Sequence, residues 1–370
     1  MAPERKRLVV IGPVPPPAHG VSVSTALILE NPELRGRFSV EHLDTSDRRG
    51  GANINTWDVQ NVLLGLKALV GLARLLRGPP GLVYVSLPQG APAFLRDSLF
   101  IQYAALRKWK VAGHLRGGEF HHFLAERGWL YKVWVRHTLS RITSVAVLGD
   151  SLRSIFDGLV PPDRLAVVPN GTPDLQRGED RRDPHLVLFL SNLRARKGLL
   201  EAIDAALRVT EADPKAHFIF AGSWYDPRLE QEARARAAPA GDRIRFVPPV
   251  SGEDKRDLLL RAAVLLFPPV EPEGHPRVVL EALAAGTPVV TTDRGAIAET
   301  VVDGECGFVL DEPVPEQLAD RVLELLSDDE RRAKMGRAAR RRYLEHYTEE
   351  RAGHRFIAWL ETLVEPSAHG

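Results

Sequence analysis

Residues 267–291, FPPVEPEGHPRVVLEALAAGTPVVT, constrain the fold of this chain more than any other stretch. The apolar run that ends at Phe267 is typical of a buried strand, and prolines break it. A helix follows, with Pro276 suited to its first turn and with Gly286 and Pro288 at its end. The apolar run after Pro288 predicts a second strand, so the stretch forms a strand, helix and strand of a parallel sheet.

Two carboxylates mark this unit, Glu273 in the loop and Glu281 on the helix. Glu273 comes just before the helix, where free backbone N–H groups and the positive end of the dipole favour an anion such as phosphate. One interpretation of Glu281 is an exposed side chain paired with Arg277, four residues earlier. The helix is apolar almost all round, however, which favours burial. A buried carboxylate needs hydrogen-bond donors, and the two hydroxyls of a sugar cis-diol would supply them.

Strand patterns and helical stretches alternate along the whole chain, which predicts parallel sheets with right-handed crossovers. A length of 370 residues is too great for one ordinary core. We therefore expect an α/β fold with two domains of about 170 to 180 residues. The clearest strand patterns occupy residues 7–12, 38–43, 82–87, 144–148, 217–222, 243–250 and 263–270.

Composition excludes several classes of protein. The net charge of +1 argues against a dedicated nucleic-acid binder. A single cysteine, Cys306, excludes an internal disulfide and suits a reducing cytoplasm. No stretch is typical of a signal peptide or long enough to span a bilayer. We expect a cytoplasmic protein, with peripheral contact at the inner face of the membrane as an alternative for the basic, aromatic helix end at residues 104–110.

Polar residues cluster in HLRGGEFHHF, residues 114–123, after a strand pattern. Glycines at the carboxyl end of a strand let a ligand approach the backbone. A metal shared by His121 and His122 is not expected, because adjacent side chains point in different directions. The candidate residues on the acceptor or sugar side are His114, Arg116, Gly117, Gly118, Glu119 and His121.

A second polar cluster lies at the turn into the helix that begins near residue 199. Arg194, Arg196 and Lys197 would add their charges to the N–H groups of that helix, which predicts a phosphate site. The alternative is a basic turn that faces solvent. A dinucleotide-binding site after residues 7–12 is disfavoured, because only Gly12 and Gly20 stand where G-x-G-x-x-G would be needed.

Residues 271–310, EPEGHPRVVLEALAAGTPVVTTDRGAIAETVVDGECGFVL, resemble the C-terminal nucleotide-sugar site of the retaining glycosyltransferase family GT4, which has the GT-B fold. The resemblance implies two Rossmann-like parallel-sheet lobes that face each other across a cleft. The expected parts are an acceptor-side domain at 1–173, a nucleotide-sugar-binding domain at 174–349, and a terminal helix at 350–370 that crosses back to the first domain.

The resemblance also implies roles for individual residues. Glu273, Lys197 and Arg116 are the catalytic candidates. The family's histidine near the donor sugar corresponds to either Arg116 or His114, and Asn192 stands where the family often has arginine. His19-Gly20 replaces a Gly-Gly pair near the donor phosphates. The donor-binding candidates are Gly20, Arg194, Lys197, Glu273, Gly274, His275, Pro276, Arg277 and Glu281.

The implied function is metal-independent, retaining transfer of a sugar from a nucleotide-diphosphate sugar, with UDP favoured over GDP. The acceptor would be a glycan, a lipid-linked molecule or a small molecule, as in polysaccharide biosynthesis. No cofactor is expected, since the nucleotide-sugar is a substrate, and no D-x-D triplet occurs for a metal. The alternatives are a GT-B-like sugar-nucleotide epimerase or phosphorylase, or a catalytically idle partner subunit. Assay for product without an acceptor would identify an epimerase or phosphorylase.

Overall fold

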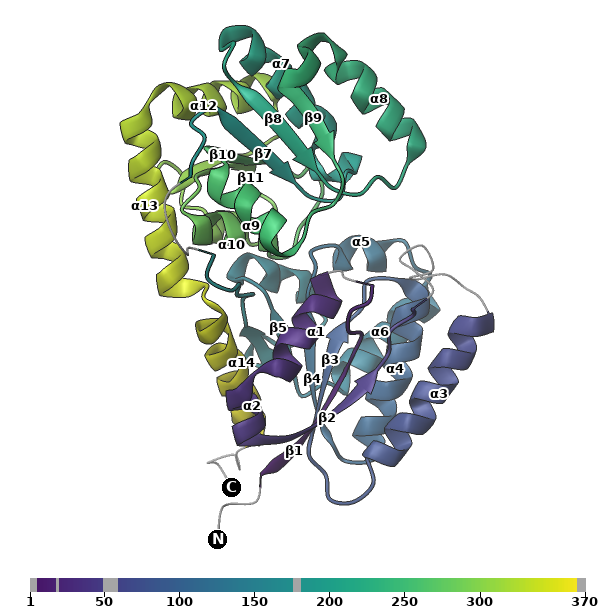
Figure 1. Cartoon of the computed structure of the whole chain (residues 1–370). Helices are drawn as coiled ribbons and strands as arrows, with labels where there is room; N and C mark the ends of the chain where they lie inside the picture. The colour runs from purple at the N-terminus through teal and green to yellow at the C-terminus, as the bar shows by residue number, and fades with distance from the viewer. Residues whose placement is uncertain (1–4, 18–19, 49–58, 176–180, 365–370) are drawn as a thin grey trace. The chain divides into compact units, whose positions relative to one another are not determined.

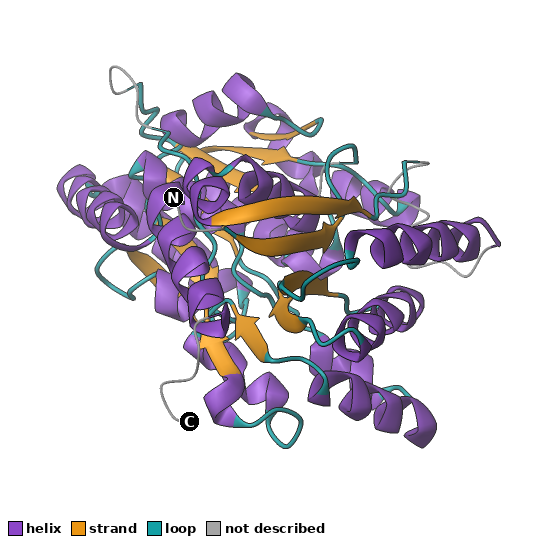
Figure 2. Cartoon of the chain, turned by 90° about the horizontal axis from the view of Figure 1, so that it is seen from below, coloured by secondary structure: helices purple, strands orange, loops and turns teal. Residues whose placement is uncertain are grey.

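The computed structural model describes residues 5–17, 20–48, 59–175 and 181–364. The chain forms two compact units, each with a six-stranded parallel sheet (Figures 1 and 2). The N-terminal unit comprises residues 1–170 and 352–370, and the C-terminal unit comprises residues 171–351. None of the helices in these described ranges is long and apolar enough to cross a membrane.

The sheet of the N-terminal unit has the order β2-β1-β3-β4-β5-β6. Its middle strands are buried on both faces, as parallel sheets require. Helices α3, α4 and α6 form one layer, while α1, α2 and the end of α14 pack on the opposite face (Figure 1). The strands are β1 (Lys6–Gly12), β2 (Phe38–Asp44), β3 (Leu82–Leu87), β4 (Lys110–Leu115), β5 (Ser144–Val147) and β6 (Leu165–Val167). The helices are α1 (Gly20–Glu30), α2 (Pro32–Arg37), α3 (Val59–Leu75), α4 (Ala91–Leu106), α5 (Phe120–Ala125) and α6 (Trp129–Ser140), with short 3-10 helices η2 (Asp150–Phe156) and η3 (Pro162–Arg164).

The last helix, α14 (Glu349–Val364), completes the core of the N-terminal unit. The indole Nε1 of Trp359 donates a hydrogen bond to the Ser144 hydroxyl at 3.0 Å. The Trp359 and Phe356 rings also pack edge-on against Tyr84 of β3, with ring centroids 6.4 and 5.1 Å away. The end of the chain is therefore a structural part of its first unit.

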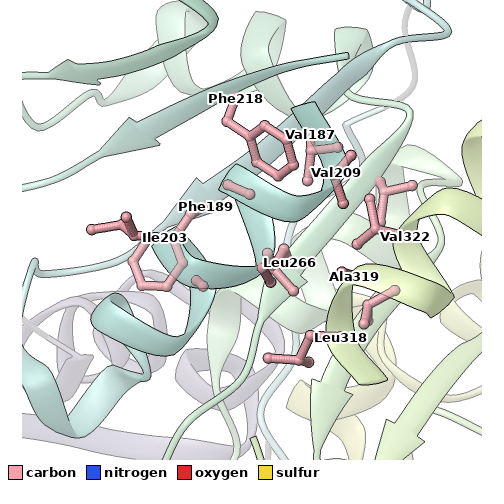
Figure 3. Close-up of a cluster of buried hydrophobic side chains, with 14 of the residues drawn as sticks. Val187, Phe189, Ile203, Val209, Phe218, Leu266, Leu318, Ala319 and Val322 are labelled. Atoms are coloured by element: carbon pink, nitrogen blue, oxygen red, sulfur yellow. The ribbon is translucent and has the colours of Figure 1, made fainter. Parts of the chain in front are cut away.

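The sheet of the C-terminal unit has the order β12-β11-β10-β7-β8-β9. On one face, Val187, Phe189, Phe218 and Leu266 pack against α7 and α12 (Figure 3). On the other face, residues of α9, α10 and α13 close the core. The strands are β7 (Leu186–Leu190), β8 (His217–Ala221), β9 (Ile244–Val247), β10 (Val264–Phe267), β11 (Val289–Thr292) and β12 (Gly307–Leu310). The helices are η4 (Ala195–Lys197), α7 (Leu199–Ala212), α8 (Pro227–Ala237), η5 (Ala238–Arg243), α9 (Gly252–Arg261), α10 (Arg277–Ala285), α11 (Ile297–Thr300), α12 (Pro315–Ser327) and α13 (Asp329–His346).

Each sheet has a point at which the direction of strand addition reverses. In the N-terminal unit the chain adds β2 on one side of β1 and β3 on the other. In the C-terminal unit β8 and β9 follow on one side of β7, and β10 to β12 follow on the other. Ligands of open parallel sheets bind outside the carboxyl ends of the strands at such points. The topology therefore predicts one site after β1 and β3 and another after β7 and β10.

The predicted α/β class with two parallel sheets is confirmed. The C-terminal unit has the six-strand Rossmann order, whereas the N-terminal unit has a flavodoxin-like order with one added strand. The sequence pattern did not distinguish these orders. Pro276 is the N-cap of α10 rather than a residue of its first turn, so the helix begins at Arg277.

We expect Trp359→Ala to lower the free energy of unfolding of the N-terminal unit by about 3–5 kcal/mol, since it removes a buried aromatic side chain. The control is Trp129→Ala, because Trp129 on α6 is 72% exposed and its removal should change stability by less than about 0.5 kcal/mol. Urea unfolding of both variants measures the difference. Equal losses would show that α14 does not complete this core.

Candidate functional site

The loops after β7 and β10 lie side by side in the C-terminal unit. Leu265 of β10 is opposite Leu188 of β7, so the two neighbouring strands end at the same level of the sheet. The N–H groups of Val270 and Glu271 donate hydrogen bonds to the carbonyl of Arg196, at 3.1 and 3.3 Å. These bonds join the basic turn and the acidic loop, which the sequence placed in separate segments.

Lys197 and Glu273 form an ion pair between Nζ and Oε1 at this junction. Glu273 is buried, and the Lys197 ammonium also lies 5.8 Å from the centroid of the Phe267 ring. A buried carboxylate is tolerated only when a cation and hydrogen-bond donors compensate its lost hydration. Two of the three catalytic candidates are therefore in direct contact, although they are 76 positions apart in sequence.

Glu281 is a second buried carboxylate, 8% exposed, on α10. Its Oε1 accepts a hydrogen bond from Nζ of Lys255 on α9 at 2.7 Å. Its Oε2 is buried without a hydrogen-bond partner in the part of the chain that the structure describes. Leaving a buried acceptor unsatisfied costs about 1–3 kcal/mol, and such an atom requires an explanation. The interpretation of Glu281 as an exposed side chain is wrong, and its free acceptor capacity suits an external donor.

Lys255 contacts the candidate site through Glu281, and the sequence did not predict this contact. It lies in GEDKRDLLLR, a helix whose mixed charges are typical of a solvent-exposed face. The only available signal was indirect: a carboxylate on an apolar helix requires a cation from elsewhere in the fold. Nothing in the spacing of 26 positions between Lys255 and Glu281 identifies the partner.

The turn that follows β11 packs against the backbone of Glu273 and Gly274. Gly295 has φ +65°, and a Cβ atom there would lie 1.9 Å from the Glu273 carbonyl oxygen. The N–H of Ala296 donates to the Gly274 carbonyl at 2.9 Å. His275 is buried beneath the loop, with Nε2 2.8 Å from the Thr300 hydroxyl. His275 therefore supports the loop and is not exposed to a ligand.

Arg194 lies over the ring of Tyr225, with its guanidinium carbon 3.9 Å from the ring centroid. Stacking of this kind fixes the orientation of the guanidinium, which can then bind a planar or anionic group. Gly198 follows the basic turn with φ +72° and allows contact with the Pro268 carbonyl, where a Cβ would lie 1.8 Å away. Asn192 is exposed. Of the predicted donor-binding residues, the structure brings Arg194, Lys197, Glu273, Gly274, His275, Pro276, Arg277 and Glu281 to the ends of β7 and β10.

The N-terminal unit contains a pocket of about 640 Å³ at its own reversal point. The ends of β1 to β4 line one side, and apolar side chains of α3 and α4 line the other. Arg116 and Glu119 are among its polar groups. The Arg116 guanidinium donates hydrogen bonds to Tyr84 Oη at 2.9 Å and to Asn170 Oδ1 at 2.9 Å, which fix its position.

His114 does not line this pocket. Its ring is 1% exposed and packs in the core, 5.8 Å from Trp359 and 6.1 Å from Tyr84 between ring centroids. Burial, and then the charge of Arg116, hold its pKa well below the ordinary value of 6.5, so the ring is neutral. Arg116, rather than His114, therefore lines the pocket, because β4 ends at Leu115 and only the next residue leaves the sheet.

The other predicted acceptor-side residues have mainly structural contacts. A Cβ at Gly117 would collide with the Gln89 amide, and the N–H of Glu119 donates to Gln89 Oε1 at 2.6 Å. Gly118 is buried, and exposed His121 has Nε2 3.0 Å from the Ser154 carbonyl oxygen. Gly20 begins α1, and His19 lies outside the described residues. Within the described ranges, no three His, Cys, Asp or Glu side chains are grouped as metal ligands.

The C-terminal unit is similar in sequence to known proteins. Residues 173–342 match the family model of the glycosyl transferases group 1. A D-inositol 3-phosphate glycosyltransferase of Corynebacterium efficiens is 33% identical over 197 residues, which are 48% of this chain and 46% of that protein. The glycogen synthase of Mycobacterium tuberculosis is 32% identical over 227 residues, which are 59% and 52%. The chain spans about half the length of the curated relatives that it matches.

Solved structures are similar over almost the whole chain. The Anabaena protein Alr3699/HepE, crystallised with UDP and glucose, has a TM-score of 0.76 and 17% identity, covering 97% of this chain and 100% of that one. Sucrose-phosphate synthase of Thermosynechococcus elongatus has a TM-score of 0.75 and 17% identity, covering 97% and 99%. A glycosyltransferase from Rickettsia africae has a TM-score of 0.72 and 15% identity, covering 98% and 100%. These likenesses show the fold, and the predicted GT-B class is confirmed.

We expect Gly295→Ala to destabilise the C-terminal unit more than Gly304→Ala. Both positions have positive φ, so both substitutions carry the cost of about 1–2 kcal/mol for a left-handed alanine. Only Gly295 also meets a backbone atom, whereas a Cβ at Gly304 would have no atom within 4 Å. The collision should add about 1–3 kcal/mol. Urea unfolding measures both, and equal losses would contradict the close support of the Glu273 backbone.

Proposed function

We propose that the chain transfers a sugar from a nucleotide-diphosphate sugar to an acceptor hydroxyl, as a member of the glycosyl transferases group 1 family, whose model matches residues 173–342. The observation that carries this proposal is the pair of buried carboxylates that follow β10, Glu273 in the loop and Glu281 on α10. Each carboxylate contacts a lysine ammonium. Oε2 of Glu281 is buried without a hydrogen-bond partner among the described residues, so that a ligand hydroxyl can donate to it.

In this proposal Glu281 binds the ribose of the donor. Its Oε2 accepts a hydrogen bond from the cis-diol, while Lys255 compensates the charge of the carboxylate through Oε1. A UDP-sugar is favoured over a GDP-sugar. Support comes from the Anabaena protein of the same fold, which was crystallised with UDP and with UDP-glucose.

The diphosphate is assigned to the turn between β7 and α7. Lys197 and Arg194 lie there, and α7 begins with backbone N–H groups that have no partner within the helix. Fixed positive charge of this kind stabilises a departing diphosphate. We therefore propose that the transfer needs no metal ion and no cofactor.

Glu273 is assigned to the transferred sugar. Its carboxylate would stabilise the positive charge that develops at the anomeric carbon as the bond to the phosphate oxygen breaks. The acceptor oxygen then bonds to that carbon from the same face, and its proton passes to the departing phosphate. This sequence retains the anomeric configuration and needs no separate general base.

The acceptor is assigned to the pocket of the N-terminal unit. Leu66, Leu69, Leu95, Leu99 and Phe100 contribute to its lining, and Arg116 and Glu119 supply charge. An apolar lining with a few polar groups favours a lipid-linked acceptor over a free glycan or a small polar molecule. A cytoplasmic location, expected from the single cysteine, is part of the same proposal.

Substitutions of the two glutamates should have different effects on UDP affinity and on turnover. We expect Glu281→Ala to weaken UDP by about 1.5–3 kcal/mol, the contribution of a hydrogen bond to a charged group. Glu273→Gln should leave UDP affinity nearly unchanged and lower kcat, because its contact is made chiefly in the transition state. Calorimetry with UDP and release of UDP from a panel of UDP-sugars measure the two effects.

The matched control is Glu305→Ala, an exposed glutamate of the same unit that should behave as the wild type in both assays. Wild-type UDP affinity in Glu281→Ala would overturn the assignment of the ribose site. Absence of UDP binding by the wild type would overturn the choice of nucleotide.

Turnover should survive EDTA, because lysine, arginine and helix N–H groups stabilise the departing diphosphate in place of a divalent cation. The measurement is UDP release with and without the chelator. A loss of turnover that magnesium or manganese restores would contradict metal independence.

A further inference from the structure

Helices α3, α4 and α6 expose many large apolar side chains. They account for ten of the fourteen exposed large hydrophobic residues in the described ranges. Val59 and Leu106 are 78% exposed, and Trp129 is 72% exposed. Scattered exposed apolar residues are normal, but a gathering on one layer marks an interaction surface. The residues of this layer are Val59, Leu63, Leu64, Leu66, Val70, Leu99, Leu106, Trp129, Leu130 and Val133, and we call them the apolar face.

These residues form one surface because their helices are neighbours. Helix α4 packs against α3 on one side and α6 on the other (Figure 1). On α3, Val59, Leu63, Leu66 and Val70 recur at helical spacing and are exposed, while Leu72 is buried. The helix thus has more apolar side chains than its inner face can bury. Such an excess is typical of an amphipathic surface helix that packs on the protein with one side and enters a membrane interface with another.

The same segment is strongly basic, although the whole chain has 49 basic and 48 acidic residues. Between residues 59 and 141 the only acidic residues are Asp97, Glu119 and Glu126. Asp97 is buried against Arg96 at 2.6 Å, and Glu126 pairs with Arg127 at 3.3 Å. The exposed basic residues on or beside the three helices are Lys67, Arg74, Arg77, Arg107, Lys108, Lys110, Arg136 and Arg141.

We propose that the N-terminal unit docks on an anionic lipid bilayer through the apolar face. Apolar side chains enter the interface between headgroups and acyl chains, and the surrounding lysines and arginines contact the anionic headgroups. Tryptophan is suited to this depth, and Trp129 is the one aromatic residue among the ten of the apolar face. A second copy of the chain is a poor occupant, because two faces of the same positive charge repel each other.

The pocket of the N-terminal unit opens beside this surface. Leu66 and Leu99 belong both to the apolar face and to the pocket lining. A lipid-linked acceptor could therefore pass from the docked bilayer into the pocket without crossing water. This last step rests on the proposed transferase function, whereas docking itself does not.

The test is co-sedimentation of the full chain with phosphatidylcholine vesicles, with and without phosphatidylglycerol, in the absence of any donor. The wild type should bind only the anionic vesicles, and high salt should weaken binding. In the apolar variant Leu63→Ser/Trp129→Ser, the partition coefficient should fall at least about tenfold, because two apolar side chains no longer enter the interface. In the charge variant Lys67→Glu/Arg136→Glu, it should also fall at least about tenfold, since each basic residue near the surface contributes about fivefold.

The matched controls lie in the C-terminal unit: Leu344→Ser for the apolar variant and Lys334→Glu for the charge variant. Both should bind as the wild type does, and thermal unfolding of all variants confirms their folding. No binding to anionic vesicles, equal binding to neutral ones, or wild-type binding by both face variants would overturn the proposal. So would a wild-type dimer that the apolar variant dissociates, since the face would then join two copies.

Because the assay contains no donor, its failure leaves the transferase proposal untouched. Conversely, vesicle binding by a chain that releases no UDP from any UDP-sugar would support docking and contradict the function.

Discussion

The candidate site depends on the cost of burying two carboxylates after β10, Glu273 in the loop and Glu281 on α10. Glu273 and Glu281 are both nearly inaccessible, and each is compensated by one lysine. Removing either lysine would leave a buried charge unpaired, which is far more costly than losing a surface pair. Backbone hydrogen bonds to the Arg196 carbonyl join the loops after β7 and β10, and Gly295 packs against the Glu273 carbonyl. A rigid arrangement of this kind suits preorganised binding of phosphate and sugar hydroxyls.

Much of the fold and part of the site could be predicted from the sequence, for physical reasons. Alternating strand and helix patterns dictate parallel sheets, and the nearly uniform apolar character of α10 dictates the burial of Glu281. Lys255 could not be predicted, because its partner is set by how α9 packs beside α10. The choice between His114 and Arg116 could not be made from the sequence, because the ring of Trp359, which packs against His114, lies on α14 at the other end of the chain.

The apolar face shows a different limit of sequence reasoning. The apolar residues of α3 recur at helical spacing, and periodicity alone would assign its leucines to a buried stripe. The structure buries Leu72 and leaves Leu63 and Leu66 exposed, because a helix covers a sheet with only one side. The basic excess between residues 59 and 141 is visible in the sequence, whereas the gathering of exposed apolar residues becomes visible only when α3, α4 and α6 are seen as one layer.

A crystal structure of the full chain with UDP tests the central claim most directly. The account predicts the ribose hydroxyls within hydrogen-bond distance of Glu281 Oε2 and the diphosphate beside Lys197, Arg194 and the start of α7. UDP bound away from the ends of β7 and β10, or a ribose without contact to Glu281, would contradict it.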